Sequence, residues 1–282
     1  MQLPFQVSLD NKVAVVTGGS GVLGSVLSKA LAQAGATVVI LARNQEKINT
    51  TVEQITQKGG KAFGFSVNVL NKEELKGVHA QILEKAGPCS ILINGAGGNN
   101  PDATTDEEFF QAAEKQDDGQ TFFDLDADRV EDVFNLNFKG TLSPTQVFAK
   151  DMVNQKEAAI INISSMNAYQ PLTKIPAYSG AKAAISNFTQ WLAVHFSKTN
   201  IRVNAIAPGF FLTEQNENLM FNEAGNYSSR ANKIISQTPV ERFGEPEELI
   251  GTLLWLVDRK SSGFVNGIVV PVDGGFSAYS GV

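Results

Sequence analysis

The chain has 282 residues, of which 43% are hydrophobic and 18% are charged, so it can bury a sizeable core and is not a disordered polymer. Its net charge is −6 and it contains no long basic run, which argues against a nucleic-acid surface. The single cysteine, Cys89, excludes an internal disulfide and suits a reducing compartment.

Targeting and metal signals are also missing from the sequence. No apolar run approaches the roughly 20 residues of a membrane span, and the first residues lack the basic and apolar regions of a signal peptide. His79 and His195 lie far apart, and no Cys/His cluster has metal-ligand spacing. We therefore expect a cytoplasmic protein without a metal site.

Short β-branched runs alternate with longer amphipathic segments, which predicts βαβ units and a parallel sheet. Most runs are continuously apolar, as expected for strands that helices cover on both faces. The predicted strands are Val13–Val16, Thr37–Leu41, Ala62–Val67, Ile91–Asn94, Ala159–Ile163, Arg202–Ile206 and Ile268–Val272. The clearest predicted helices are Gly24–Gln33, Arg129–Asn154, Ala177–Lys198 and Pro246–Asp258.

Two stretches interrupt this alternation. Residues 97–128 are polar and acidic, and residues 210–239 are mixed and rich in Asn and Glu. Long irregular segments in an α/β domain are commonly lids or binding loops, and both follow strand carboxyl ends, where open α/β sheets bind ligands. We expect one domain over residues 1–282 with substrate-binding insertions at these two places; solvated surface decoration is the alternative.

The segment Thr17–Gly24 (TGGSGVLG) links the first strand to the first helix. Glycines there permit a tight turn and let backbone N–H groups approach a pyrophosphate at the helix N-terminus. A tight turn without a ligand is the alternative. With the predicted sheet, this segment indicates a Rossmann-type, doubly wound dinucleotide-binding fold.

The end of the second predicted strand bears on the choice of cofactor. An acidic residue there would bond the ribose hydroxyls of NAD, whereas an arginine accommodates the 2′-phosphate of NADP. The sequence has Arg43 and no acid, which favours NADP(H). If Arg43 is only a solvated residue at the start of a helix, NAD(H) remains possible.

Tyr178 and Lys182 lie four residues apart in a helical segment and so share one face. An ammonium group beside a phenol lowers the phenol's pKa and brings it closer to the acid–base range. Ser165 ends a predicted central strand shortly before this helix. The three residues could therefore converge on one catalytic site.

Together these residues resemble the single-domain type of the short-chain dehydrogenase/reductase family, over essentially the whole chain. Tyr178 would then be the acid–base residue, Ser165 would bind the reacting oxygen, Lys182 would bind the nicotinamide ribose, and Asn137 would hold a water of the proton relay. The matching pieces are Thr17–Gly24, Asn94–Gly97, Asn137, Ser165, Tyr178–Lys182, Pro208–Gly209 and Val272–Gly275.

The resemblance also implies a set of cofactor contacts. Three positions depart from the family pattern: Val22 replaces a glycine of the turn, Asn68 replaces an acid near the adenine, and Gly95 replaces an asparagine. The expected cofactor residues are Thr17, Gly18, Ser20, Gly21, Val22, Leu23, Gly24, Arg43, Asn68, Val69, Asn94, Ala96, Gly97, Tyr178, Lys182, Pro208, Gly209, Phe211 and Thr213.

Several short sequence segments, including residues 97–102 and 275–282, resemble the D-mannonate oxidoreductases of this family, which interconvert D-fructuronate and D-mannonate. Such a sugar acid needs hydrogen-bond partners for its hydroxyls and a cation for its carboxylate. The candidate substrate residues are Asn99, Asn100, Asn167, Lys174, Gln215 and Arg230. Each could instead be a solvated loop residue.

Other functions are also compatible with the sequence. The protein could be another carbonyl reductase, of the gluconate 5-dehydrogenase or 3-oxoacyl-carrier-protein reductase type, or a dinucleotide-binding protein without catalysis. The family resemblance implies a homotetramer built on the helices near 129–154 and 177–198 and on the last strand. His195 is expected to be a packing or interface residue.

Overall fold

The computed structural model describes residues 6–111, 119–213, 217–222 and 224–281. Seven parallel strands form one sheet in the order β3-β2-β1-β4-β5-β6-β7, which confirms the predicted Rossmann-type, doubly wound architecture. The strands are β1 (Val13–Thr17), β2 (Thr37–Ala42), β3 (Lys61–Ser66), β4 (Ile91–Asn94), β5 (Ala158–Ile163), β6 (Ile201–Pro208) and β7 (Val269–Val272).

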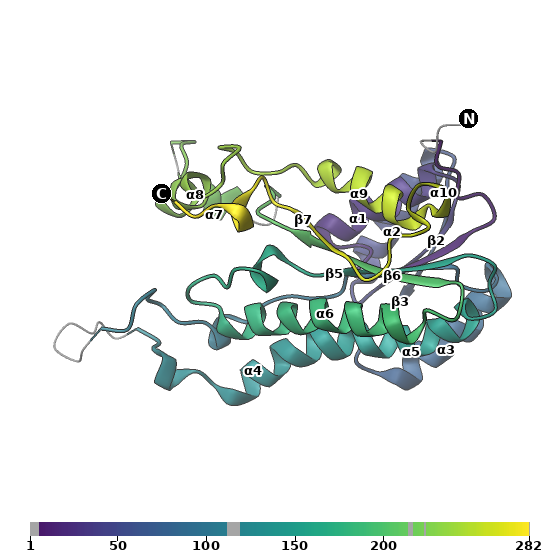
Figure 1. The fold of residues 1–282 in the computed structure, drawn as a ribbon, viewed down its shortest axis with the longest axis horizontal. Helices are drawn as coiled ribbons and strands as arrows, with labels where there is room; N and C mark the ends of the chain where they lie inside the picture. The colour runs from purple at the N-terminus through teal and green to yellow at the C-terminus, as the bar shows by residue number, and fades with distance from the viewer. Residues whose placement is uncertain (1–5, 112–118, 214–216, 223, 282) are drawn as a thin grey trace.

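Helices cover both faces of this sheet (Figure 1). Alternate side chains of β1 enter the two cores: Ala14 and Val16 pack in one, and Val13 and Val15 pack in the other. Because each central strand feeds two cores, its sequence is apolar throughout. One face carries α1 (Val22–Gln33), α2 (Gln45–Gln57) and α9 (Leu249–Val257), and the other carries α3 (Lys72–Lys85), α5 (Gly140–Met152) and α6 (Pro176–His195).

The predicted helix Arg129–Asn154 is not one continuous α-helix. It consists of α4 (Ala127–Phe134), a π-helical turn η4 (Asn135–Lys139) and α5. The apolar periodicity hides this irregularity, because a π turn adds one residue without ending the helix. Such turns occur frequently at functional sites, and this one carries Asn137.

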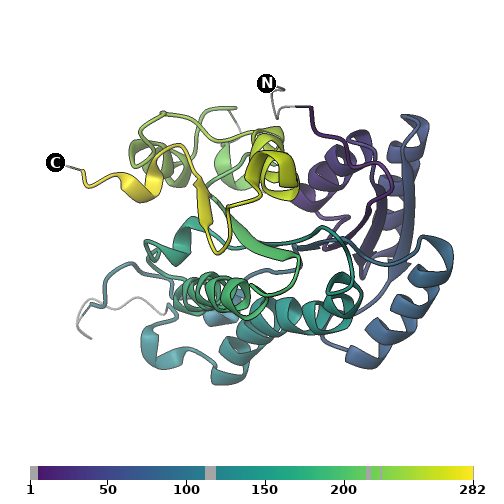
Figure 2. The same cartoon turned by 45° about the vertical axis from the view of Figure 1, so that its right-hand side comes forward.

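The described parts of the two predicted insertions contain short helices and 3₁₀ turns. Residues 97–128 include the 3₁₀ turns η1 (Pro101–Ala103) and η3 (Phe122–Asp124), and residues 210–239 include α7 (Glu217–Met220) and α8 (Ser229–Ser236). Both insertions lie at the same end of the molecule in two views (Figures 1 and 2). The other short elements are η5 (Met166–Ala168), η6 (Pro246–Glu248), α10 (Arg259–Ser262) and η7 (Phe276–Ala278).

Candidate active site

The Gly-rich turn has the backbone of a phosphate cradle. Gly18 has φ 66°, and a Cβ atom there would lie 2.8 Å from the carbonyl oxygen of Gly95. A Cβ atom on Gly24 would lie 2.1 Å from the carbonyl oxygen of Gly18. The turn therefore requires glycine at both positions, and it stays narrow enough for backbone groups to approach a ligand.

The start of α1 has no side-chain cap. Gly21 is the N-cap and has no side chain that could accept from the first N–H groups of the helix, and such N–H groups can bind an anion. Val22 is the first helical residue, an ordinary position for a side chain. Its departure from the family pattern therefore leaves the turn intact. Ser20 precedes the N-cap Gly21, and Leu23 follows Val22 in the first turn of the helix.

Strand order reverses between β1 and β4, the place where ligands bind in such sheets. Thr17 pairs with Asn94 across this point, and its Oγ1 accepts hydrogen bonds from the N–H groups of Gly95 (3.1 Å) and Ala96 (3.2 Å). Thr17 thus shapes the loop that follows β4. Asn94 donates from Nδ2 to Thr145 Oγ1 and to Asn162 Oδ1, both at 2.9 Å, and so supports the central strands.

The proposed catalytic side chains converge at the carboxyl end of β5. Lys182 Nζ lies 5.5 Å from the Tyr178 ring centroid and donates to the carbonyl oxygen of Ile163, the last residue of β5, at 2.9 Å. The Ser165 hydroxyl forms a hydrogen bond with Tyr178 and accepts one from the Asn167 N–H at 3.2 Å. These contacts fix the hydroxyls of Ser165 and Tyr178 beside each other.

Burial controls the electrostatics of this cluster. It raises the pKa of Tyr178 above the ordinary value of 10, and the hydrogen bond from Ser165 opposes this only in part. Burial also lowers the pKa of Lys182 from 10.5 to about 8. The expected lowering of the Tyr178 pKa by Lys182 is wrong in direction here, because desolvation of the phenol outweighs its neighbours. Tyr178 is consequently protonated at neutral pH, the form that can donate a proton.

Asn137 connects this cluster to the loop after β4. Its Nδ2 donates to the carbonyl oxygens of Gly98 (2.7 Å) and Val133 (2.8 Å), and its Oδ1 accepts from the Gly98 N–H at 3.3 Å. A Cβ atom on Gly97 would lie 2.7 Å from Asn137 Oδ1 and 3.2 Å from Lys182 Nζ. Gly97 is therefore the point at which the loop touches two proposed catalytic side chains.

The remaining predicted cofactor residues follow the carboxyl ends of β2, β3 and β6. Arg43 and Asn68 are exposed, and Val69 is buried. Asn68 Oδ1 accepts from the N–H of Leu70 at 3.0 Å. Three further residues follow β6 or end it: Pro208, Gly209 and the buried Phe211, with Thr213 two residues beyond. All lie on the edge of the sheet that carries the Gly-rich turn.

Among the predicted substrate residues, Asn167 stands apart. It is 4% exposed, and no described group makes a hydrogen bond with its Oδ1. By contrast, three others hold the 97–128 insertion together: Asn99 donates to Thr104 Oγ1, Asn100 caps η1, and Lys174 donates to the carbonyl oxygen of Asp106. Arg230 is exposed on α8, and Gln215 lies outside the described residues.

One neighbour of the catalytic helix has no signal in the sequence. Ala103, from the insertion, is fully buried in a small cluster with Ala177 and Ala181, against which Tyr178 packs. An isolated alanine in a polar segment carries no periodic pattern, so only the structure reveals this contact. The insertion is thus packed onto the helix that carries the proposed acid–base residue.

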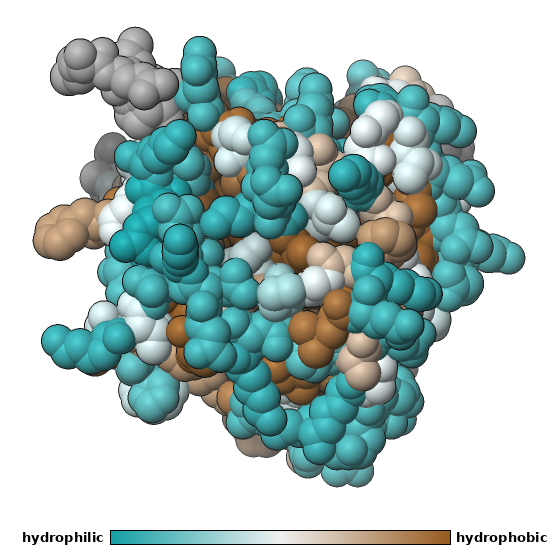
Figure 3. All heavy atoms as spheres, turned by 90° about the vertical axis from the view of Figure 1, so that its right-hand side faces the viewer, coloured by the Kyte–Doolittle hydropathy of each residue, from teal (hydrophilic) through white to brown (hydrophobic). Residues whose placement is uncertain are grey.

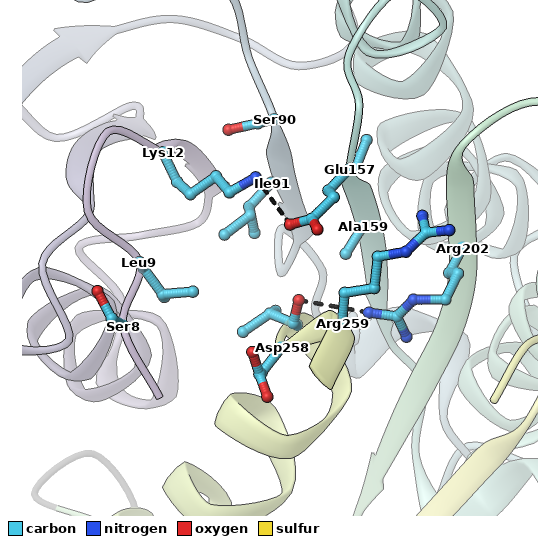
Figure 4. Close-up of a pocket in the computed structure, with 12 residues that line it drawn as sticks. Ser8, Leu9, Lys12, Ser90, Ile91, Glu157, Ala159, Arg202, Asp258 and Arg259 are labelled. Carbon is cyan, nitrogen blue, oxygen red and sulfur yellow. Dashed lines mark hydrogen bonds and ion pairs between the residues drawn. The ribbon is translucent and has the colours of Figure 1, made fainter. Parts of the chain in front are cut away.

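A small pocket lies at the opposite, amino edge of the sheet (Figure 4). Its volume is about 30 Å³, enough for one or two waters but not for a dinucleotide. Arg202 in this pocket donates to the carbonyl oxygens of Leu256 and Val257 at the end of α9, a structural role. The surface at this end mixes hydrophilic and apolar residues (Figure 3). This edge is a poor candidate for the active site.

Metal-binding and membrane-spanning features are absent from the part of the chain that the structure describes. Its residues contain no group of three or more His, Cys, Asp or Glu side chains that could hold a metal ion. Nor do they include a helix with both the length and the hydropathy required to cross a membrane.

Comparisons with known proteins agree with this geometry. Residues 12–224 match the short chain dehydrogenase family. A Haemophilus influenzae structure with bound NAD, provisionally named a D-mannonate oxidoreductase, is 58% identical and superposes with a TM-score of 0.95 over 100% of both chains. The Bacillus subtilis protein called uncharacterized oxidoreductase UxuB is 53% identical and covers 99% of this chain and 100% of its own.

A more distant structure extends the pattern. A gluconate 5-dehydrogenase from Burkholderia cenocepacia, in complex with NADP and tartrate, is 26% identical with a TM-score of 0.81, over 98% of this chain and 99% of its own. Family match, whole-length relatives and the cradle described above point the same way. The chain belongs to the short-chain dehydrogenase family and is a nicotinamide-nucleotide-dependent oxidoreductase.

Proposed function

We propose that this oxidoreductase interconverts a keto sugar acid and its hydroxy acid, and that it reduces D-fructuronate to D-mannonate. The observation that carries the proposal is the buried amide oxygen of Asn167, two residues after Ser165, which has no hydrogen-bond partner among the described residues. A buried acceptor without a partner is costly unless a ligand satisfies it, and a sugar hydroxyl is a suitable donor. The name of the 58%-identical H. influenzae protein supports the same substrate.

The chain's own residues would act as follows in the direction of reduction. The Ser165 hydroxyl donates a hydrogen bond to the ketone oxygen and stabilises the negative charge that develops there. Tyr178 transfers its phenolic proton to that oxygen, which becomes the alcohol. Lys182, as an ammonium, stabilises the resulting phenolate. When bound, the nicotinamide nucleotide would supply the hydride for the ketone carbon.

We further propose that Arg43 gives the enzyme a preference for NADP(H). It is exposed directly after the carboxyl end of β2, at the position where an acidic residue would bond the ribose hydroxyls of NAD. The R43A variant should lose about tenfold in kcat/KM with NADPH and change little with NADH, a loss in the range of one charged hydrogen bond. A wild-type preference for NADH would contradict this assignment.

We also propose that the protein forms a homotetramer, because an apolar groove is exposed on its surface. An apolar groove of about 400 Å³ lies between α5 and α6, and Trp191 within it is 56% exposed although stacked between Phe188 and His195. An exposed groove of this kind suits a subunit interface. Light scattering should give a tetramer for the wild type and a smaller species for W191E; a wild-type monomer would refute the proposal.

The substrate is tested by initial reduction rates on three ketones with NADPH and with NADH. D-Fructuronate, 5-ketogluconate and an acetoacetyl thioester represent the proposed reaction and the two alternative carbonyl reductases. We expect the highest kcat/KM with D-fructuronate. A clear preference for either other ketone would overturn the substrate assignment and leave the assignment as an oxidoreductase in place. Nucleotide binding without turnover of any ketone would contradict a catalytic role.

A further inference from the structure

A continuous segment, residues 97–108, runs from the catalytic residues to the rim of the site; we call it the strap. At its start, Gly98 is bound through both N–H and carbonyl to the side chain of Asn137. Further along, Ala103 is buried in the cluster that Ala177 and Ala181 form with Tyr178. The first half of the strap therefore rests directly on the catalytic cluster.

The middle of the strap is tied to the loop that leads into α6. The N–H of Thr105 donates to the carbonyl oxygen of Lys174 at 2.8 Å, and Lys174 Nζ donates back to the carbonyl oxygen of Asp106. Lys174 has φ 73°, in the left-handed region that a side chain other than glycine rarely adopts. Such strain persists only where the surroundings enforce it, and here the two hydrogen bonds to the strap do so.

The end of the strap reaches the second insertion. Glu108 forms an ion pair and hydrogen bond with Lys233 of α8. The side chain of Glu108 is 26% exposed and that of Lys233 is 62% exposed. The hydrogen bond from Lys233, followed by the charges of Lys233 and Lys174, holds the pKa of Glu108 below its ordinary value. Glu108 thus sits between cations from two different parts of the chain.

Helix α8 provides a fixed support for this contact. Ala231 and Ile234 bury one face of the helix against Met220 and Phe243, and the Ser228 hydroxyl caps its start by accepting from the Ala231 N–H. Among the hydrogen bonds and ion pairs of the described residues, the pair of Glu108 and Lys233 joins the strap to α8. This ion pair joins the two insertions, and both lie at the same end of the molecule (Figures 1 and 2).

We propose that Glu108 is a positioning residue: its ion pair with Lys233 holds the strap between α6 and α8, and this closes the rim over the bound keto acid. The inference rests on the proposed function for its substrate but not for its geometry. Closing the rim stabilises bound substrate without contacting the reacting carbon, so its loss should raise KM and leave kcat unchanged. Exposed ion pairs contribute modestly, so we expect a change of about fivefold.

The kinetic test uses variants of both partners. E108Q and K233M should each raise KM for the ketone that the wild type reduces by about fivefold, and the double variant should be no worse than either single one. The E108K/K233E double variant should recover most of the loss that each reversal causes alone. E107Q is the matched control, because Glu107 is an exposed neighbour whose removal leaves the ion pair in place. Additive effects of E108Q and K233M would overturn the proposal.

A second measurement needs no substrate and separates this inference from the proposed function. Hydrogen exchange reports the amide of Thr105, which bonds to Lys174, and that of Asp106, which bonds to the carbonyl oxygen of Gln120. Both should exchange about fivefold faster in E108Q than in the wild type or E107Q. Equal exchange rates in E108Q and the wild type would overturn the proposal that Glu108 holds the strap, even if D-fructuronate is the substrate. Faster exchange without turnover of D-fructuronate would support that proposal and reject only the substrate assignment.

Discussion

The candidate active site has a floor, formed by Asn137, Ser165, Tyr178 and Lys182, and a rim, formed by the two insertions, and these two regions are built differently. On the floor, Asn137 is fully buried and Lys182 and Ser165 are 4% and 7% exposed, each held by hydrogen bonds to backbone groups. On the rim, Phe109 and Phe123 of the 97–128 insertion are 76% and 77% exposed. Packing therefore fixes the chemistry of the floor, whereas the rim can change without disturbing the sheet.

Lys182→Met is the strongest test of the floor's role in catalysis. The substitution removes the cation that, in our proposal, stabilises the Tyr178 phenolate, and we expect turnover to fall by about 10³-fold, within the range for acid–base catalysis. A circular dichroism spectrum equal to that of the wild type serves to show that the variant is folded, because Lys182 is itself an expected cofactor contact. Turnover within a few-fold of the wild type would mean that the floor does not depend on this charge.

The same variant should be more stable than the wild type at neutral pH. The fall in the Lys182 pKa from 10.5 to about 8 means that burying this ammonium costs the wild type about 3 kcal/mol. The variant avoids this cost but loses the hydrogen bond to Ile163, which contributes about 1 kcal/mol. We therefore expect the free energy of unfolding to rise by about 2 kcal/mol.

The pH dependence of this effect has a defined sign. Between pH of about 8 and 10.5 the unfolded chain binds more protons than the folded chain, because the Lys182 pKa is lower in the folded state. The difference in free energy of unfolding between Lys182→Met and the wild type should therefore become smaller as pH rises through this window. An equal difference at pH 7 and pH 10, measured by denaturation, would show that the pKa of Lys182 is not depressed.

Gly97→Ala tests how closely the floor is packed. The added Cβ would lie 2.7 Å from Asn137 Oδ1, so the loop or the amide must shift, and a displacement of about 1 Å in such a site costs about 100-fold in turnover. Gly98→Ala is the matched control, because its Cβ would meet Leu136 at an ordinary 3.5 Å. Activity close to that of the wild type in Gly97→Ala as well as in Gly98→Ala would indicate that the loop adjusts to the added methyl group.

Asn167→Ala should have the smallest effect and should depend on the substrate. Loss of one neutral hydrogen bond to a substrate hydroxyl predicts a fall of about fivefold in kcat/KM for a sugar acid and little change for a ketone without hydroxyls. Asn99→Ala, on the exposed part of the rim, is the control. An equal loss on both kinds of ketone would show that Asn167 supports Ser165 rather than binding substrate.

The same contrast explains what could be predicted from the sequence. The sheet and the Tyr178–Lys182 face follow from apolar runs and a four-residue spacing, and both are local signals. The π turn at Asn137 was missed because the apolar pattern continues through it. Burial reversed the expected shift of the Tyr178 pKa, since desolvation depends on tertiary packing and not on spacing.

The rim was harder still to predict. Lys174 and Asn100 were expected to face substrate, yet the structure uses them to hold the insertion. Glu108 and Lys233 are 125 residues apart and carry no motif, so their ion pair follows only from the three-dimensional structure. Surface polar residues have many possible partners, and sequence alone does not choose among them.

The central claim is that Tyr178 is the proton donor of a buried, preformed site. The most direct measurement is turnover of the best ketone by Tyr178→Phe, with nucleotide affinity measured in parallel. We predict a fall in kcat of at least about 10³-fold with nucleotide affinity within about twofold of the wild type. Near-normal kcat in Tyr178→Phe would contradict the assignment and move the acid–base role to another group.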